Sequence, residues 1–98
     1  MLKTSAVFVG DGSLLVQCAD AFRRAGHGIV AVVSAGQANL DWAAAEGLPA
    51  IRMEGDWARQ LDDLEFDYLF SVANLRLLPQ SVLDRAGRMA INFHDALL

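Results

Sequence analysis

The sequence predicts a three-layer α/β fold, a parallel β-sheet with helices on both faces, and three observations support this prediction. Short, continuously apolar segments end at turn residues, as strands buried on both faces of a sheet do. Segments in which apolar residues recur at helical spacing follow these strands. The two patterns alternate along the chain, and strands joined by helices pair in parallel through right-handed crossovers.

The first predicted strand covers residues 5–9 and ends at Gly10-Asp11-Gly12. An amphipathic helix follows, with Ser13 as its predicted N-cap and Gly26 as its end. Its apolar face consists of Leu14, Leu15, Cys18, Phe22 and Ala25. Polar residues occupy the other side, so we expect this helix to lie on the sheet.

The second and third predicted strands show the same alternation. Residues 29–33 form a continuously apolar strand, followed by a short helix with Asn39 as its cap and Gly47 as its end. Residues 50–53 form a weaker strand, and a helix is predicted from about residue 56 to residue 64.

The last two predicted strands cover residues 68–73 and 89–94. Between them we expect a helix with Pro79 in its first turn, where the missing N–H and fixed φ of proline are tolerated, and with Gly87 at its end. No segment follows that could cover the fifth strand. We therefore expect one domain, residues 1–98, that is incomplete at its C-terminal end.

Composition and charge exclude several classes of function. The 98 residues carry a formal charge of −4 and their basic residues are scattered, so we expect no nucleic acid to bind this segment. No apolar segment is long enough to span a bilayer, which predicts no contact with a membrane. A single cysteine and the absence of a signal peptide predict a cytoplasmic protein. No metal-ligand spacing occurs, so no metal site is predicted.

In parallel sheets of this Rossmann-like type, ligands bind at the carboxyl ends of the strands. Gly10-Asp11-Gly12 lies at such an end and suggests a dinucleotide site. The third glycine of that motif is replaced by Leu15, and the second strand leads into Ser34 instead of an acidic residue. We interpret the glycines as a turn that requires positive φ, and a nucleotide-binding domain remains an alternative.

Asn92 and His94 form the second candidate site. They are two residues apart on a predicted strand, so their side chains should share one side of it at its carboxyl end. An amide and an imidazole together can stabilise the oxyanion of an acyl-transfer intermediate. The spacing alone is equally consistent with a polar strand end hydrogen-bonded to its own loop.

Residues 90–98, Ala-Ile-Asn-Phe-His-Asp-Ala-Leu-Leu, resemble the Asn-x-His-x-Ser-Leu-Leu-Pro signature of the folate-dependent formyltransferases. This family includes the methionyl-tRNA, glycinamide ribonucleotide and amino-sugar enzymes. Residues 68–79 resemble the strand, loop and Leu-Pro helix start that precede the signature in this family. The resemblance covers essentially the whole chain and implies a truncated formyltransferase fold, with residues 1–98 as its N-terminal portion.

The resemblance also implies roles for individual residues. Asn92 and His94 match the catalytic pair that polarises the formyl group of 10-formyltetrahydrofolate while a substrate amine attacks it. Leu77, Leu78 and Pro79 match the loop that lines the pterin pocket. The third catalytic residue of the family, an aspartate, would lie after Leu98, so the isolated chain is expected to be inactive.

A second departure from the family, besides the missing aspartate, bears on the partners. Asp95-Ala96 stands where Pro or Gly followed by Ser is commoner, which resembles the formylating domains fused to peptide synthetases and implies fusion to further domains. The acceptor is then a small-molecule or carrier-bound amine. An inactive formyltransferase-like binding or docking module is the alternative. The uncovered fifth strand could also pair with a second copy and form a homo-oligomer.

Overall fold

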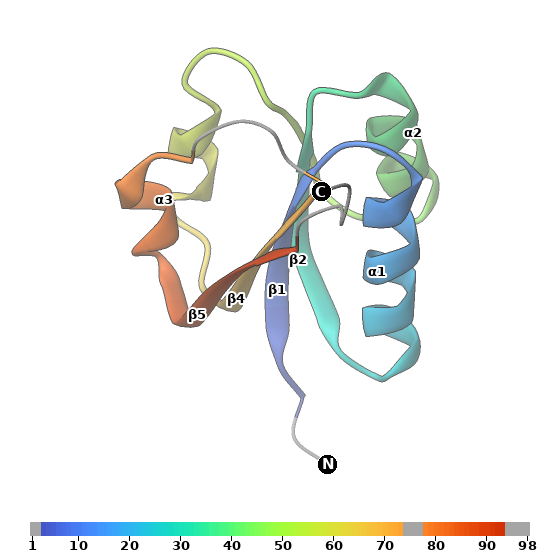
Figure 1. The fold of residues 1–98 in the computed structure, drawn as a ribbon, viewed down its shortest axis with the longest axis horizontal. Helices are drawn as coiled ribbons and strands as arrows, with labels where there is room; N and C mark the ends of the chain where they lie inside the picture. Colours follow the sequence, from blue (N-terminus) through green and yellow to red (C-terminus); the bar gives the residue numbers. More distant parts are fainter. Residues whose placement is uncertain (1–2, 74–77, 94–98) are drawn as a thin grey trace.

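The computed structural model describes residues 3–73 and 78–93 and shows a twisted sheet between two layers of helices (Figure 1). The strands are β1 (Ser5–Gly10), β2 (Gly28–Ser34), β3 (Ala50–Arg52), β4 (Phe66–Val72) and β5 (Ala86–Phe93). The helices are α1 (Ser13–Arg24), α2 (Gln37–Ala45), the 3₁₀ helix η1 (Trp57–Leu61) and α3 (Gln80–Leu83).

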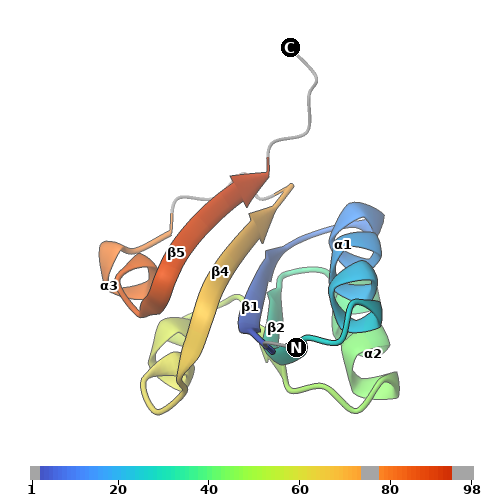
Figure 2. The same cartoon turned by 90° about the horizontal axis from the view of Figure 1, so that it is seen from below.

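The sheet is parallel throughout, as the sequence predicted, with the strand order β3-β2-β1-β4-β5. The chain builds outward from β1 through β2 to β3, then crosses back and builds outward from β4 to β5. Helices α1 and α2 cover one face, while η1 and α3 lie on the other (Figure 2). The strand order therefore reverses between β1 and β4, where folds of this type form a crevice.

Each face of the sheet carries its own apolar core. The core on the α1–α2 face consists of Ala6, Phe8, Leu15, Ala19, Val32, Ala43 and Val72. The core on the η1–α3 face consists of Val7, Val9, Ala31, Val33, Ile51, Met53, Leu61, Phe66, Leu69 and Val82. Alternate residues of β1 and β2 enter opposite cores, which explains why these strands are apolar at every position.

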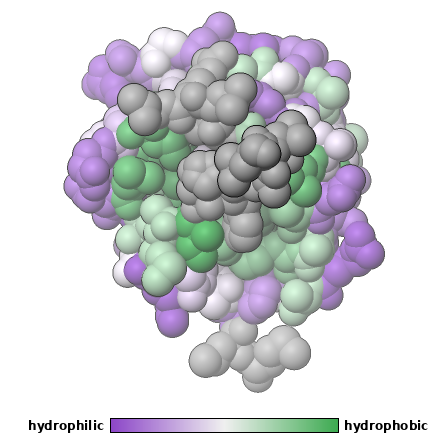
Figure 3. All heavy atoms as spheres, in the orientation of Figure 1, coloured by the Kyte–Doolittle hydropathy of each residue, from purple (hydrophilic) through white to green (hydrophobic). Residues whose placement is uncertain are grey.

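The sheet is less completely covered near β5. Apolar side chains gather in the middle of the face that Figure 3 shows. Met89 on β5 is 57% exposed, and its neighbour across the sheet, Tyr68 on β4, is only half-buried. β5 is also an edge strand within the described part of the chain.

In the ranges 3–73 and 78–93, no helix is long and apolar enough to cross a membrane.

Two of the predicted helix N-caps are wrong. Helix α1 already begins at Ser13, with Gly12 as its N-cap, and α2 begins at Gln37, with Gly36 as its N-cap. Asn39 instead lies buried inside α2. Its side chain binds the turn after β1, so it is not available to cap its own helix.

The two later helices are shorter than predicted. The predicted helix over residues 56–64 is the single 3₁₀ helix η1. The helix after Pro79 ends at Leu83, with Pro79 as its N-cap, and Ala86 and Gly87 belong to β5. These residues pair with β4, and this pairing overrides the helical pattern. The two strands approach closely at Gly87, where a Cβ would lie 3.3 Å from the carbonyl oxygen of Phe66. Glycine thus permits close strand pairing where the sequence suggested a helix end.

Candidate functional site

The carboxyl edge of the sheet has two halves, and the first is the turn region after β1 and β2. Oδ1 of Asp11 accepts hydrogen bonds from Oγ of Ser34 at 2.8 Å and from the backbone N–H groups of Ala35 and Gly36, both at 3.1 Å. Gly36 is the N-cap of α2, so this carboxylate lies at the positive end of that helix. A helix N-terminus that could bind an external anion is therefore already occupied by a side chain.

Asn39 completes this network from inside α2. Its Oδ1 accepts from the N–H of Gly12 at 2.9 Å, and its Nδ2 donates to the carbonyl oxygen of Gly12 at 2.9 Å. Asn39 is only 4% exposed and Ser34 is fully buried. We call Asp11, Gly12, Ser34, Gly36 and Asn39 the Asp11–Asn39 network. The network joins the turn after β1 to the turn after β2, and its polar groups are hydrogen-bonded to one another or to the backbone of these turns.

The glycines of the first turn have structural explanations. Gly10 has φ 152°, and a Cβ at this position would lie 1.9 Å from the carbonyl oxygen of Val72. Gly12 has φ 86°, as the interpretation of this segment as a positive-φ turn predicted. Close approach of β1 to β4 and the turn into α1 therefore account for both residues. This geometry gives no support to the dinucleotide alternative.

The second half of the edge lies where β4 and β5 end. Ser71 on β4 is the Cα partner of Asn92 on β5, and Val72 is the partner of Phe93. Ser71 is 6% exposed, so a hydroxyl group is buried beside the predicted site. Ala73 follows β4 with φ 51°, and among the described residues it is the only one other than glycine with positive φ. Such backbone strain is found most often at functional sites.

The structure describes some of the predicted site residues and not others. Asn92 lies near the carboxyl end of β5, as predicted. Leu78 is half-buried and packs against the core of the η1–α3 face, and Pro79 is exposed at the start of α3. His94 and Leu77 lie outside the described residues, so their placement beside Asn92 and Leu78 stays a prediction.

Sequence reasoning missed Ser71 and the Asp11–Asn39 network. Ser71 is a polar residue within the apolar segment 68–73, and that interruption was the available signal. The network had no comparable signal, because Asp11 and Asn39 are 28 positions apart in the sequence. Across the described ranges, no group of three or more His, Cys, Asp or Glu residues is arranged to hold a metal ion. The prediction of no metal site remains a prediction.

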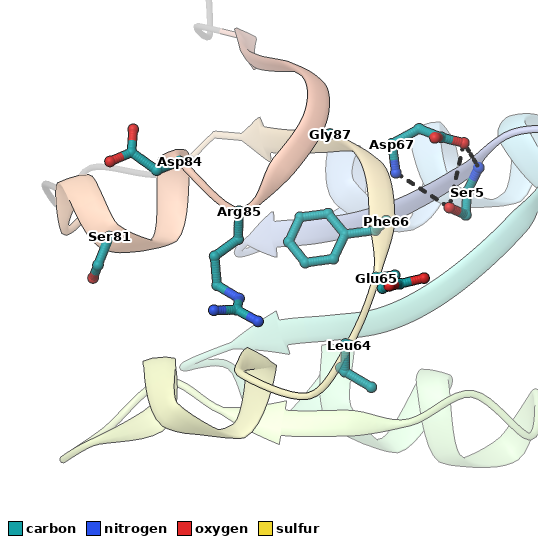
Figure 4. A pocket seen from close by; sticks show the side chains of 9 residues that line it. All are labelled: Ser5, Leu64, Glu65, Phe66, Asp67, Ser81, Asp84, Arg85 and Gly87. Carbon is teal, nitrogen blue, oxygen red and sulfur yellow. Dashed lines mark hydrogen bonds between the residues drawn. The ribbon is translucent and has the colours of Figure 1, made fainter.

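A separate cavity lies at the opposite edge of the sheet, where β4 and β5 begin (Figure 4). It has a volume of about 740 Å³ and is lined by Ser5, Leu64, Glu65, Phe66, Asp67, Ser81, Asp84, Arg85 and Gly87. Oδ2 of Asp67 accepts from the N–H of Ser5 at 3.0 Å, and Arg85 lies 3.7 Å from the carboxylate of Asp62. These contacts hold the elements together at the edge opposite the one where ligands bind in such sheets.

Comparison with known proteins shows a similarity to formyltransferases along nearly the whole chain. Two methionyl-tRNA formyltransferases from Anaeromyxobacter dehalogenans, strains 2CP-1 and 2CP-C, are 35% and 36% identical to the chain over 93% of its length. The chain is thus similar to the N-terminal part of methionyl-tRNA formyltransferases. No family model matches it. The chain spans about a third of these relatives, 34% of each, and the match supports a formyltransferase-family N-terminal domain.

A solved structure supports the fold of the chain. The crystal structure of a formyltetrahydrofolate deformylase from Pseudomonas putida KT2440 aligns with 99% of the chain at a TM-score of 0.73. The aligned part is 40% of the deformylase chain. The two sequences are 17% identical, so this likeness shows the fold alone. It confirms the predicted Rossmann-like parallel sheet.

Proposed function

We propose that this chain carries the Asn/His half of an N-formyltransferase site, which transfers a formyl group from 10-formyltetrahydrofolate to a substrate amine. The observation that carries the proposal is the identity with the two methionyl-tRNA formyltransferases along nearly the whole chain. The position of Asn92 at the carboxyl end of β5, in register with buried Ser71, agrees with it.

Asn92 and His94 would act on the formyl oxygen. The amine nitrogen attacks the formyl carbon, a new C–N bond forms, and negative charge develops on the oxygen. The Asn92 amide would donate a hydrogen bond to that oxygen, and His94 would polarise the same group, as oxyanion-stabilising donors do. When the intermediate collapses, the bond between the formyl carbon and N10 breaks, and N10 takes up a proton as tetrahydrofolate leaves.

The proton lost by the attacking amine needs a base. Asp11 cannot serve, because its carboxylate is bound in the Asp11–Asn39 network at the other half of the edge. The resemblance assigns this role to an aspartate after Leu98. We therefore propose that residues 1–98 are the N-terminal portion of the domain and are inactive alone.

The pterin ring would be held by Leu77, Leu78 and Pro79. Leu78 packs against the core on the η1–α3 face, which is also the face of Leu69 on β4. Flat rings bind in apolar slots with few polar anchors, and this connection before α3 provides apolar side chains. Folate contacts would then lie on the same side of the sheet as Ser71, because alternate residues of a strand share a face.

The acceptor is proposed as a small-molecule or carrier-bound amine in cytoplasmic one-carbon biosynthesis. The formal charge of −4 disfavours binding of a nucleic acid by this segment alone. Further domains fused to the chain would then determine which amine is formylated.

Formyl transfer can be measured in a chimera in which residues 1–98 replace the matching segment of the 2CP-1 methionyl-tRNA formyltransferase. We expect the chimera to formylate methionyl-tRNA, the acceptor in that relative's name. Asn92→Ala and His94→Ala should each lower kcat by roughly 10²–10³-fold, the usual cost of an oxyanion donor. Gln37→Ala, at an exposed position of α2, is the control and should retain full activity.

Two results would refute the proposed function. One is a chimera that unfolds cooperatively and binds a 5-formyl folate analogue no better than buffer. The other is an active chimera whose rate is unchanged by both Asn92→Ala and His94→Ala.

A further inference from the structure

The two faces of β5 are covered to different extents. On the η1–α3 face, α3 lies beside β5, and its residue Val82 is buried in the core. On the other face, α1 and α2 lie over the first three strands, α1 reaches as far as β4, and β5 extends beyond both helices (Figure 2). Strands of parallel sheets are normally covered on both faces. One side of β5 therefore lacks the cover that its fold type provides.

The uncovered side of β4 and β5 is an apolar surface. Tyr68 and Phe70 belong to the α1–α2 face, and the register places Met89 beside Tyr68 and Ile91 beside Phe70. Paired residues of neighbouring strands share a face of the sheet. Phe22 of α1 completes the surface, because its ring centroid lies 5.5 Å from that of Phe70. We call these five residues the β4–β5 patch. Met89 is exposed, the other four are half-buried, and none is acidic or basic.

A hollow of about 270 Å³ opens beside the β4–β5 patch. It is lined by Phe8, Cys18, Ala21, Phe22 and Phe70, so a thiol is its only polar side-chain group. Pockets for small molecules usually measure about 300–1,000 Å³ and contain several polar groups that orient the ligand. This hollow is smaller and almost entirely apolar. It therefore fits one apolar side chain of a protein segment better than it fits a cofactor.

The length of the relatives indicates which segment could cover the patch. The two methionyl-tRNA formyltransferases match this chain with only 34% of their own length. With residues 1–98 as the N-terminal portion of such a domain, as proposed above, the polypeptide continues from β5. This strand carries Met89 and Ile91, the half of the patch that lies beyond α1. The next segment of the domain is thus the part of the chain nearest to the patch.

The winding of the sheet excludes one course for that segment. β4, α3 and β5 form a right-handed unit whose helix lies on the η1–α3 face. A further parallel strand outside β5 would place its connecting helix on that same face and leave the patch open. Covering the patch therefore requires the chain to turn back after β5 and to lie across the α1 side of the sheet.

We propose that the β4–β5 patch is the docking surface for the next segment of the formyltransferase domain, an amphipathic helix that inserts one large apolar side chain into the hollow beside Phe70. The identity of this occupant rests on the proposed function, whereas the apolar patch itself does not. Packing of the apolar face of a helix into an apolar groove is a common mode of recognition. Because β5 also carries Asn92, docking would hold the candidate site against the rest of the domain.

Oxidation of methionine by dilute hydrogen peroxide, followed by peptide mass spectrometry, measures whether the patch is covered. In the 98-residue chain, Met89 should form sulfoxide roughly tenfold faster than Met53, because Met89 is 57% exposed and Met53 only 4%. In the chimera described above, Met89 should be slowed roughly tenfold by its cover, while the rate at Met53, the internal control, stays the same.

A charge in the patch should weaken docking. Met89→Glu should lower the Tm of the chimera by several degrees, because the carboxylate would be buried against the docked helix. The same substitution should leave the Tm of the 98-residue chain nearly unchanged, since Met89 is exposed there. Leu14→Glu is the matched control, because Leu14 is 38% exposed on α1 and lies outside the patch, and it should change neither Tm.

A peptide allows the same test without a folded chimera. The peptide has the sequence that follows the matched segment in the 2CP-1 enzyme. Added to the 98-residue chain, it should slow the oxidation of Met89 saturably and leave Met53 unchanged. Isothermal titration should show weaker binding of the peptide to Met89→Glu and unchanged binding to Leu14→Glu.

The outcomes separate the docking surface from the proposed function. Met89 that is oxidised equally fast in a folded chimera that transfers formyl groups would overturn the docking surface alone. Protected Met89 in a folded chimera without transfer would support the docking surface and reject the proposed function. Protection that grows with the concentration of the 98-residue chain itself would overturn the proposal in favour of a second copy. If the chimera does not fold, failure of millimolar peptide to protect Met89 would overturn the proposal.

Discussion

The two halves of the carboxyl edge use their polar residues in opposite ways. After β1 and β2, Asp11 accepts hydrogen bonds from Ser34 and from the backbone of the second turn, and Asn39 binds the backbone of Gly12 in the first turn. At the end of β4 and β5, Ser71 is a buried residue and Ala73 has a strained positive φ. The polar groups of the first half are therefore satisfied within the fold, while the second half combines a buried serine with strained backbone.

This difference separates structural polarity from functional polarity within one sheet. A buried polar group whose hydrogen bonds are all made inside the fold contributes to stability and specificity of packing. Strained backbone at the carboxyl end of a parallel strand is instead typical of a functional site. Substitutions in the first half should therefore change stability, and substitutions in the second half should change folate binding or transfer.

The largest stability effect should come from Gly10→Ala. The new Cβ would lie 1.9 Å from the carbonyl oxygen of Val72, so β1 and β4 would have to separate. We expect a loss of about 3 kcal/mol or more in the free energy of unfolding, measured by urea denaturation. Gly12→Ala is the matched control, because its φ is also positive but nothing lies within 4 Å of its Cβ, and it should cost only about 1–2 kcal/mol. Equal losses in the two variants would show that the contact with Val72 is not the cause.

Asn39→Ala should have an intermediate effect. It removes two hydrogen bonds to Gly12, for an expected loss of about 2 kcal/mol in unfolding free energy. Gln37→Ala, exposed on the same helix, should change stability by less than about 0.5 kcal/mol. The Kd of the chain for a 5-formyl folate analogue should be unchanged by Asn39→Ala. A variant of normal stability, or one that loses folate binding, would contradict the division of the edge into two halves.

Ala73→Gly should have the smallest effect, and of opposite sign. Glycine tolerates φ 51°, so the substitution relieves strain while it increases the entropy of the unfolded chain. We expect a net gain of about 0.5 kcal/mol in unfolding free energy. Ala25→Gly, where φ is −77°, removes no strain and should destabilise the chain. A loss of stability in Ala73→Gly would mean that the strain is not relieved by glycine.

The sequence predicted the architecture well because buried parallel strands leave a direct signature of continuous apolar segments. The strands around residues 5–9, 29–33 and 68–73 were each recognised from this signature. Helix ends were harder to predict, because Asn39 binds Gly12 across a turn and Gly87 belongs to a strand that pairs with β4. Such tertiary contacts override local preferences for caps and helix ends.

The candidate site was predicted from the spacing of Asn92 and His94 and from the resemblance to the formyltransferase signature. Neither of these predicts which residues of other strands lie beside the site. Asn92 was placed correctly at the end of the last strand, since residue order alone defines that position. The pairing of Ser71 with Asn92 could not be predicted from the sequence, because it depends on the register of β4 and β5. Register is a property of the assembled sheet.

Titration of the ¹⁵N-labelled chain with 5-formyltetrahydrofolate, followed by backbone amide shifts, tests most directly where the site lies. Saturable shifts should appear at Ser71 to Ala73, Leu78 and Asn92, and the amides of Gly12, Ala35 and Gly36 should stay unchanged. A parallel titration with a nicotinamide nucleotide should shift neither group. Shifts confined to the turns after β1 and β2, or no shifts at millimolar folate, would contradict the placement of a formyltransferase site at the end of β4 and β5.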